Sequence, residues 1–388
     1  MRVLINGVAA LRPKTGIGHY IDSLCEHFET TGRDHVELFP GELARRCVRR
    51  LFRPKRATSA GGTPAPWKAT AVKWAQKAGS LVFRKAFRSL AGRMNADLYH
   101  EPNYIPWRCD LPTIATVHDL SVLLYPEWHP IERVKYFATH FFAGLDKCVH
   151  LVTDTECVRQ EIIGKLGIAP SKISSVHLGI RPECRAMSAA EVQPLLKNLD
   201  LKPGYLLHVG TIEPRKNLLR LMRAYVDLPS DLRESHPLIL VGGWGWRNEQ
   251  IRDYYESSAR HAGVRKLGYV PDEDLPALYN GARALLFPSH YEGFGLPPLE
   301  MLACGGAVIS SSAGSVAEIL PRHYDLIHPE DTAGWRDRMR QVLTDDAYWQ
   351  SLRQGSARHA ARFNWNACAN NTWQVYERVT GRRHRAAA

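Results

Sequence analysis

Short apolar runs alternate with amphipathic stretches along most of this chain. The apolar runs predict strands at residues 2–6, 36–39, 97–101, 112–117, 151–153 and 173–176, and a second series at 205–209, 238–241, 265–267, 285–287 and 308–310. The amphipathic stretches predict helices at 19–28, 133–144, 155–166, 218–225, 249–262, 274–279, 298–303 and 315–319. Strands and helices that take turns in this way are typical of α/β proteins with parallel, doubly wound sheets. A looser stretch at 179–203 separates the two series, and we interpret it as a linker between two domains.

Length and composition agree with a protein of more than one domain. The chain has 388 residues, of which 45% are hydrophobic, enough for two or three buried cores. No apolar run is long enough to span a membrane, and the N-terminal run lacks the cleavage site of a signal peptide. The eight cysteines show no C-x-x-C spacing, so we expect free thiols in a reducing cytosol, without zinc or a disulfide framework.

The positive charge of the chain is concentrated in one segment. The net charge is +12, yet residues 45–93 alone carry fourteen basic side chains and no acidic one, which leaves the remainder nearly neutral. Helical periodicity over 67–90 gathers cations on one arc and tryptophan and aliphatic residues on another, interrupted by Lys85. This pattern favours an anionic membrane surface as the partner. A solvated helix packed on its own domain is the main alternative, and nucleic acid is disfavoured.

A glycine-rich turn lies between a predicted strand and a predicted helix near the middle of the second series. The strand at 285–287 leads into a loop at 292–296, and Pro297 and Pro298 open a helix. Free N–H groups and the helix dipole favour a phosphate at such a loop. Glu292 and Glu300 flank it, and because carboxylates accept hydrogen bonds from hydroxyls, they indicate a sugar attached to the phosphate. The alternative for Glu300 is that it only complements the helix dipole.

Other polar residues follow predicted strands. Arg215 and Lys216 are adjacent cations that suit a diphosphate, because Arg can bind bidentately and Lys as a point charge. His118 ends a strand, where ligands bind in open α/β sheets, and is suited to bind hydroxyls or assist proton transfer. We interpret Asp119 as the cap of the following turn. The acidic run at 272–274 resembles a D-x-D metal motif, but its place before a helix favours capping.

Four segments together resemble the family-4 retaining glycosyltransferases. Residues 292–300 match the E-x7-E motif of that family, and G-T-I-E-P-R-K-N at 210–217 matches a second motif. T-G-I-G-H-Y at 15–20 resembles its N-terminal glycine loop. T-V-H-D-L at 116–120 is similar to a segment of its mannosyltransferase-like members. The resemblance covers most of the chain and implies the GT-B fold, in which two Rossmann-like doubly wound domains face a central cleft.

The same resemblance implies roles for individual residues. Catalytic roles fall on Glu292, Arg215, Lys216 and His118. Donor-binding roles fall on Gly16, Gly18, Phe294, Gly295, Leu296, Glu300, Tyr269 and Val270. In this assignment Glu300 binds the ribose, Glu292 binds the transferred sugar, and the glycine loops approach the diphosphate through their backbone. The residues at 269–270 hold the edge of the base. Neither a metal ion nor another cofactor is implied, and no side chain is assigned as a nucleophile.

We therefore expect a retaining glycosyltransferase with a nucleotide-sugar donor. The motifs resemble bacterial mannosyltransferases of surface polysaccharide synthesis, so GDP-mannose is the expected donor and a lipid-linked glycan the expected acceptor. The expected place is the cytoplasmic face of the membrane, contacted through residues 45–93. A UDP-sugar donor is the first alternative, and a non-enzymatic membrane- or nucleic-acid-binding protein the second. The expected domains are 1–180 for the acceptor and 181–364 for the donor, followed by a segment at 365–388 that ends in a basic tail. The resemblance implies that a helix at 365–378 in this segment crosses back to the first domain.

Overall fold

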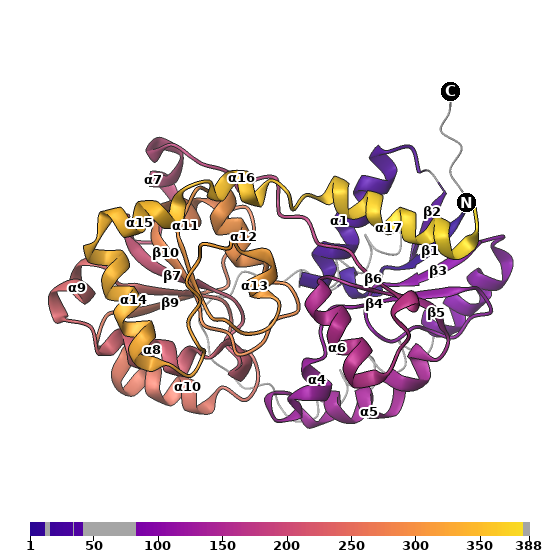
Figure 1. The fold of residues 1–388 in the computed structure, drawn as a ribbon, viewed down its shortest axis with the longest axis horizontal. Helices are drawn as coiled ribbons and strands as arrows, with labels where there is room; N and C mark the ends of the chain where they lie inside the picture. The colour runs from indigo at the N-terminus through magenta and orange to yellow at the C-terminus, as the bar shows by residue number, and fades with distance from the viewer. Residues whose placement is uncertain (12–15, 34, 42–82, 383–388) are drawn as a thin grey trace.

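The computed structural model describes residues 1–11, 16–33, 35–41 and 83–382, which form two lobes (Figure 1). The N-terminal lobe holds a six-stranded sheet in the order β2-β1-β3-β4-β5-β6, with every pair parallel. Its strands are β1 Val3–Asn6, β2 Val36–Phe39, β3 Leu98–Glu101, β4 Thr113–Val117, β5 Cys148–Thr153 and β6 Ile173–Ser175. The predicted strands of this half are confirmed, with boundaries that differ by at most three residues.

The C-terminal lobe repeats this plan with five parallel strands in the order β11-β10-β7-β8-β9. They are β7 Tyr205–Val209, β8 Leu238–Val241, β9 Val264–Gly268, β10 Ala282–Phe287 and β11 Val308–Ser310. The central strands β7 and β8 are buried at every position, because helices cover both faces of the sheet. This burial explains why these strands read as unbroken apolar runs.

Helices connect the strands of each lobe. In the N-terminal lobe they are η1 Val8–Leu11, α1 Gly16–Thr30, α4 Ser121–Leu124, η2 Pro126–Trp128, α5 Ile131–Leu145, α6 Glu156–Leu166 and η3 Pro170–Lys172. In the C-terminal lobe they are α7 Ala189–Asn198, η4 Pro214–Lys216, α8 Leu218–Val226, α9 Ser230–Ser235, α10 Glu249–Tyr254, η5 Tyr255–Ala259, α11 Leu275–Gly281, α12 Leu296–Ala303 and α13 Val316–Ile319. The chain ends with α14 Thr332–Thr344, α15 Asp346–Arg353, α16 Ser356–Ala360 and α17 Trp365–Thr380.

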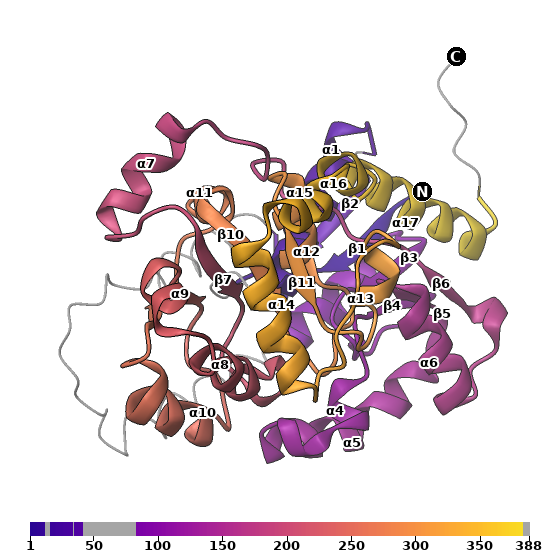
Figure 2. The ribbon, with the colours of Figure 1, turned by 60° about the vertical axis from the view of Figure 1, so that its left-hand side comes forward.

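The stretch at 179–203 was expected to be a loose linker, and this is wrong for its second half. Residues Ala189–Asn198 form α7, which lies at the periphery of the C-terminal lobe (Figure 2). A reciprocal capping box starts the helix: Ser188 accepts from the Glu191 N–H, and Glu191 accepts from the Ser188 N–H. Val192 and Leu196 are buried, so packing as well as capping holds the helix in place.

The last helix returns to the first lobe. The helix predicted at 365–378 is observed as α17, which lies along α1 above the N-terminal sheet (Figure 1). Its Trp373 ring packs edge-on against Phe28 with 5.4 Å between the ring centroids. Its Tyr376 hydroxyl lies 2.6 Å from His100 Nδ1 on β3. The end of the chain therefore completes the core of the lobe in which the chain begins.

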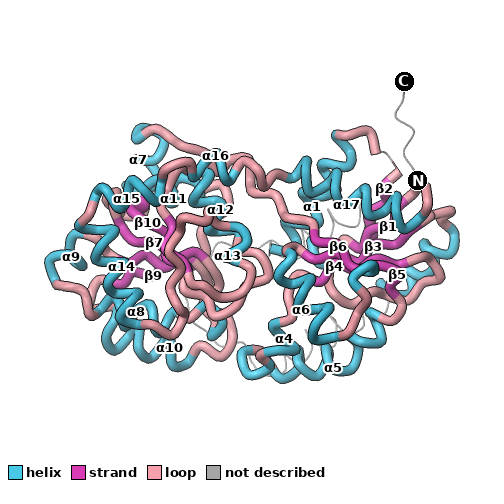
Figure 3. The backbone as a smooth tube through the Cα atoms, in the orientation of Figure 1, coloured by secondary structure: helices cyan, strands magenta, loops and turns pink. Residues whose placement is uncertain are grey.

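The two lobes contact each other mainly through loops (Figure 3). Thr155 donates its hydroxyl to the Gly293 carbonyl at 3.0 Å. Glu318 accepts hydrogen bonds from the N–H groups of Glu156 and Cys157 at 2.9 and 2.8 Å. This carboxylate of the C-terminal lobe thus caps the N-terminus of α6 in the other lobe, where the helix dipole favours negative charge.

Residues 42–82 lie outside the described residues, and with them most of the basic segment 45–93 and most of the predicted helix at 67–90. The described end is helical over 83–93. There Phe87 is buried against Tyr99, with 4.8 Å between the ring centroids, while Arg84, Lys85 and Arg88 are exposed. Within the described part of the chain, no helix is both long and apolar enough to cross a membrane.

Candidate active site

Glu292 lies at the centre of a buried charged cluster between the lobes. The loop after β10 carries it, and its side chain meets two cations from the turn that follows β7. One carboxylate oxygen is 2.6 Å from Lys216 Nζ, and the other is 2.8 Å from Arg215 Nη1. Burial by itself would raise the pKa of Glu292, but the two positive charges outweigh it and lower the pKa to about 2. The structure therefore brings together three of the four residues predicted to be catalytic.

The second motif positions these cations through its remaining polar residues. Glu213 accepts hydrogen bonds from Arg215 Nε and Nη2 at 3.1 and 3.0 Å, which orients the guanidinium. Asn217 adopts a left-handed backbone with φ of 56° and donates its amide to the carbonyls of Pro288 and Pro329, at 3.1 and 2.8 Å. The asparagine thereby ties the cationic turn to the loop that carries Glu292.

Two glycines allow the loop after β10 to take its path. At Gly293 a Cβ atom would lie 1.9 Å from the His118 carbonyl oxygen, so only glycine permits this approach of the lobes. Gly295 has φ of 111° and precedes α12, which starts at Leu296. The Phe294 ring packs near Phe363 with 6.1 Å between centroids. Contact of the loop backbone with sugar or diphosphate stays a prediction.

Glu300 is also buried, but it faces a different set of partners. Its Oε2 accepts a hydrogen bond from the Tyr279 hydroxyl at 2.7 Å, and its Oε1 lies 3.3 Å from Arg181 Nη1. Arg181 also lies 3.4 Å from Asp272, which in turn is 2.8 Å from His19 Nε2 in the opposite lobe. The interpretation of Glu300 as a mere dipole complement therefore misses its side-chain partners.

Sequence reasoning missed Arg181 and Tyr279, and it misread the acidic run at 272–274. Arg181 stands in the expected linker, and no local pattern connects it to Glu300. The expectation of helix capping is wrong for Asp274, whose side chain makes no capping hydrogen bond to α11. Asp272 instead contacts Arg181 and His19. Among the residues the structure describes, no group of three or more His, Cys, Asp or Glu is placed to hold a metal ion.

His118 is held on both ring nitrogens. Nδ1 lies 2.8 Å from Asp154 Oδ2, and Nε2 lies 2.9 Å from the Pro102 carbonyl oxygen. Since both partners are acceptors, the ring fits best as an imidazolium that donates twice. Burial would lower the pKa of His118, but Asp154 outweighs it and raises the pKa. Neither nitrogen is free for substrate in this arrangement, and a direct role for His118 stays a prediction.

The turn after His118 behaves as expected. Asp119 accepts hydrogen bonds from the Ser121 N–H and hydroxyl at 2.9 and 2.8 Å. Its interpretation as a turn cap is therefore confirmed.

The N-terminal glycines occupy a different place from the one predicted. The helix was expected to begin at His19, after a loop ending at Gly18, but α1 begins at Gly16. Residues 12–15 of the preceding loop lie outside the described residues. The contact of His19 with Asp272 shows that this end of α1 faces the other lobe. The helix N-terminus is thus directed toward the other lobe, and the positive end of its dipole suits an anion.

The predicted base-edge residues follow β9. Tyr269 is 69% exposed, whereas Val270 is buried. Their contact with a base stays a prediction.

The chain has two parallel α/β lobes, a glycine loop at the start of α12, and Arg215 and Lys216 paired with Glu213 and Glu292. This combination is that of a glycosyltransferase with the GT-B architecture. The family described as Glycosyltransferase Family 4 matches residues 15–183, and the one described as Glycosyl transferases group 1 matches residues 196–359. O-antigen chain mannosyltransferase B from Escherichia coli is 36% identical over 282 residues, covering 72% of this chain and 74% of that protein. The chain belongs to the family-4 glycosyltransferases and is a hexosyltransferase, as its motifs indicated.

Two further similarities extend this comparison. The serotype-specific mannosyltransferase WbdA from Escherichia coli is 28% identical over 282 residues, which cover 71% of this chain but only 34% of WbdA. The chain thus corresponds to about a third of the length of that relative. Sucrose-phosphate synthase from Thermosynechococcus elongatus superposes with a TM-score of 0.70 at 19% identity, covering 98% of this chain and 99% of the other. That match confirms the predicted fold.

Proposed function

We propose that this enzyme transfers mannose, with retention of configuration, from GDP-mannose to a lipid-linked glycan in bacterial surface polysaccharide synthesis. The observation that carries the proposal is the 36% identity to O-antigen chain mannosyltransferase B, over nearly three quarters of both chains. The cluster of Glu292, Arg215 and Lys216 supplies the chemistry that such a donor requires.

Arg215 and Lys216 bind the donor diphosphate in this proposal. The bond from the anomeric carbon to the diphosphate breaks during transfer, so negative charge grows on the leaving group. Cations already fixed by Glu213 and Asn217 stabilise that charge without reorganising. Before the donor binds, Glu292 partly neutralises both cations. The diphosphate takes over this role, and Glu292 is then available to accept hydrogen bonds from the sugar hydroxyls.

Glu300 binds the ribose hydroxyls, oriented by Tyr279. Because Arg181 lies 3.3 Å from one Glu300 oxygen, the ribose either displaces this contact or uses the second oxygen. Backbone N–H groups at the start of α12 and α1 complete the anion site from both lobes. No metal ion or other cofactor takes part, and the diphosphate charge is met by side chains and helix ends.

The acceptor binds from the side of the N-terminal lobe, at the cytoplasmic face of the membrane. The basic segment 45–93 holds the enzyme there, because each cation near anionic lipid contributes about 1 kcal/mol. Nucleic acid is not a partner in this proposal.

Thermal shifts with GDP, UDP, ADP and their sugars, measured in EDTA, test the donor assignment. A ligand at 100 times its Kd stabilises the folded protein by about 2.7 kcal/mol. We expect GDP and GDP-mannose to raise Tm selectively, with no need for a divalent ion. A selective UDP response would replace the donor by a UDP-sugar, and a well-folded protein that responds to no nucleotide would contradict the enzymatic role of the cleft.

A further inference from the structure

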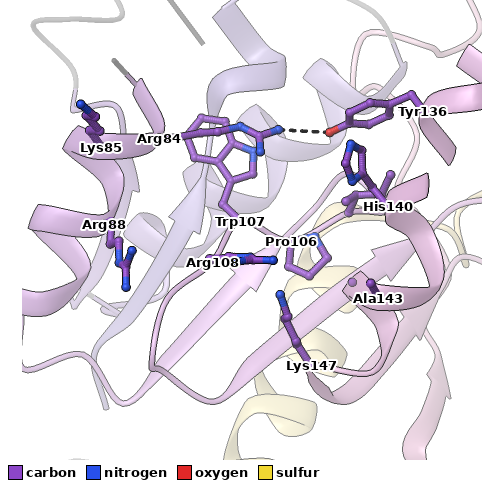
Figure 4. A pocket seen from close by; sticks show the side chains of 12 residues that line it. Arg84, Lys85, Arg88, Pro106, Trp107, Arg108, Tyr136, His140, Ala143 and Lys147 are labelled. Atoms are coloured by element: carbon purple, nitrogen blue, oxygen red, sulfur yellow. Dashed lines mark hydrogen bonds between the residues drawn. The ribbon is translucent and has the colours of Figure 1, made fainter. Parts of the chain in front are cut away.

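A basic cavity opens on the N-terminal lobe, lined by residues that the proposed reaction does not use. Its volume is about 290 Å³. Helix 83–93 forms one side, the loop between β3 and β4 forms the centre with Trp107, and α5 with the turn after it forms the other side (Figure 4). The cavity is therefore built from three separate segments and not from one exposed helix.

The charge of this cavity is entirely positive. Its cationic lining consists of Arg84, Lys85, Arg88, Arg108 and Lys147, and no acidic residue of the described ranges lines it. Among the described residues, no carboxylate forms an ion pair with any of these five. Arg84 is held by the Tyr136 hydroxyl at 3.2 Å and by the Trp107 ring at 5.5 Å from the centroid, neither of which neutralises it. Cations gathered without counter-charge favour an anionic ligand.

The helix that forms one wall also exposes large apolar side chains. On α5, Ile131 is 51% exposed, Phe142 is 49% exposed, and Tyr136, which lines the cavity, is 40% exposed. Aromatic and aliphatic groups beside cations are typical of a surface that meets the boundary between lipid headgroups and acyl chains. The compact cavity fits one phosphate group better than a nucleic-acid backbone, which needs an extended basic track.

We propose that this cavity binds the phosphate of an anionic lipid headgroup and so fixes the orientation of the enzyme on the membrane. This inference rests on the proposed membrane association, but not on the donor or on the transfer reaction. Helix 83–93 is the end of the basic segment, so the cavity gives that segment a defined phosphate site in addition to its diffuse charge. Tyr136, which lines the cavity and is 40% exposed, contacts the headgroup layer beside it.

Co-sedimentation with vesicles of phosphatidylcholine, with and without phosphatidylglycerol, tests the proposal on the full chain. The variant Arg88→Ala/Lys147→Ala removes two exposed cavity cations. The control Arg322→Ala/Arg358→Ala removes two exposed cations from the C-terminal lobe. We expect the cavity variant to bind anionic vesicles about 30-fold more weakly and the control to change binding by less than about threefold. Free glycerol phosphate should compete with the vesicles for the wild type and for the control, but not for the cavity variant.

Three results would overturn the proposal. Equal losses of vesicle binding in the two double variants would assign binding to diffuse charge. A wild type that does not bind anionic vesicles would exclude the membrane as the partner of the cavity. Binding of free phosphate or of an oligonucleotide through the same two cations, without a loss of vesicle binding, would assign another ligand. The thermal response to GDP is measured in the same samples. If the cavity variant keeps its thermal response to GDP, a loss of vesicle binding concerns the cavity alone and not the donor assignment.

Discussion

Glu292→Gln separates the two roles that the structure gives to this side chain. Glutamine keeps the shape of glutamate but removes its charge. In the wild type, the carboxylate lies 2.6 Å from Lys216 Nζ and 2.8 Å from Arg215 Nη1, so it competes with a diphosphate for both cations. The variant leaves these cations less neutralised. We expect it to bind GDP more tightly than the wild type and yet to transfer sugar poorly.

The expected gain in GDP affinity follows from the charge that the substitution removes. A unit charge about 6 Å from the diphosphate contributes roughly 2–3 kcal/mol at an effective dielectric constant of about 20, so GDP binding should tighten more than about tenfold. The same substitution also lowers the free energy of unfolding of the protein without ligand. Glu292 has its pKa lowered from 4.5 to about 2, which corresponds to roughly 3 kcal/mol of interaction that the variant loses.

Calorimetric titration with GDP, denaturant unfolding and single-turnover transfer measure the three quantities on the same protein. Glu256→Gln is the matched control, because its exposed carboxylate pairs with Arg260 and contacts no residue of the cluster. We expect the control to change none of the three by more than about threefold. Weaker GDP binding by Glu292→Gln, in a folded sample, would refute the idea that the carboxylate competes with the diphosphate.

Three other predictions test the same geometry. The pKa of Glu292 is lower in the folded state, so the stabilisation that its charge gives is complete above pH 4.5 and is lost as the pH falls toward 2. The free energy of unfolding of the wild type should therefore fall by roughly 3 kcal/mol over this range, and that of Glu292→Gln should not show this fall. Gly293→Ala places a Cβ 1.9 Å from the His118 carbonyl oxygen, so small-angle scattering should show a more open molecule and transfer should fall more than about 100-fold; an unchanged shape would contradict the contact. Tyr279→Phe removes the hydrogen bond to Glu300 and should weaken GDP binding about fivefold while weakening 2′,3′-dideoxy-GDP binding little; equal losses would argue against ribose binding by Glu300.

The sequence was most informative where local pattern and burial agree. Strands such as β7 and β8 are buried at every residue, so their apolar runs stand out. Helix α17 was expected from the family resemblance, and the structure shows it packed on α1. Helix α7 was missed although its capping box is a local signal, because the polar stretch around it resembles a linker. Helices α14 to α16 were not predicted either, since charged residues dilute their apolar faces.

The candidate site was predictable to the extent that its residues stand in motifs. Glu292, Arg215 and Lys216 were expected separately, and the structure joins them in one cluster. The contact of Arg181 with Glu300 links residues far apart in the sequence, and it arises only when the linker passes over α12. The full engagement of His118 likewise depends on Asp154, which ends a neighbouring strand. Such contacts follow from the tertiary arrangement, which periodicity and spacing do not contain.

Transfer of labelled mannose from GDP-mannose to a lipid-linked glycan acceptor in EDTA is the most direct test of the central claim. Wild-type protein and Glu300→Gln are compared at equal folded concentration, with GDP-mannose and a UDP-hexose as alternative donors. We expect a labelled, extended lipid-linked product with GDP-mannose alone. The transfer rate of Glu300→Gln should be more than about tenfold lower, because the neutral amide binds the ribose less well. A Glu300→Gln variant with undiminished transfer, or a wild type that transfers no sugar to any lipid-linked acceptor, would contradict the central claim.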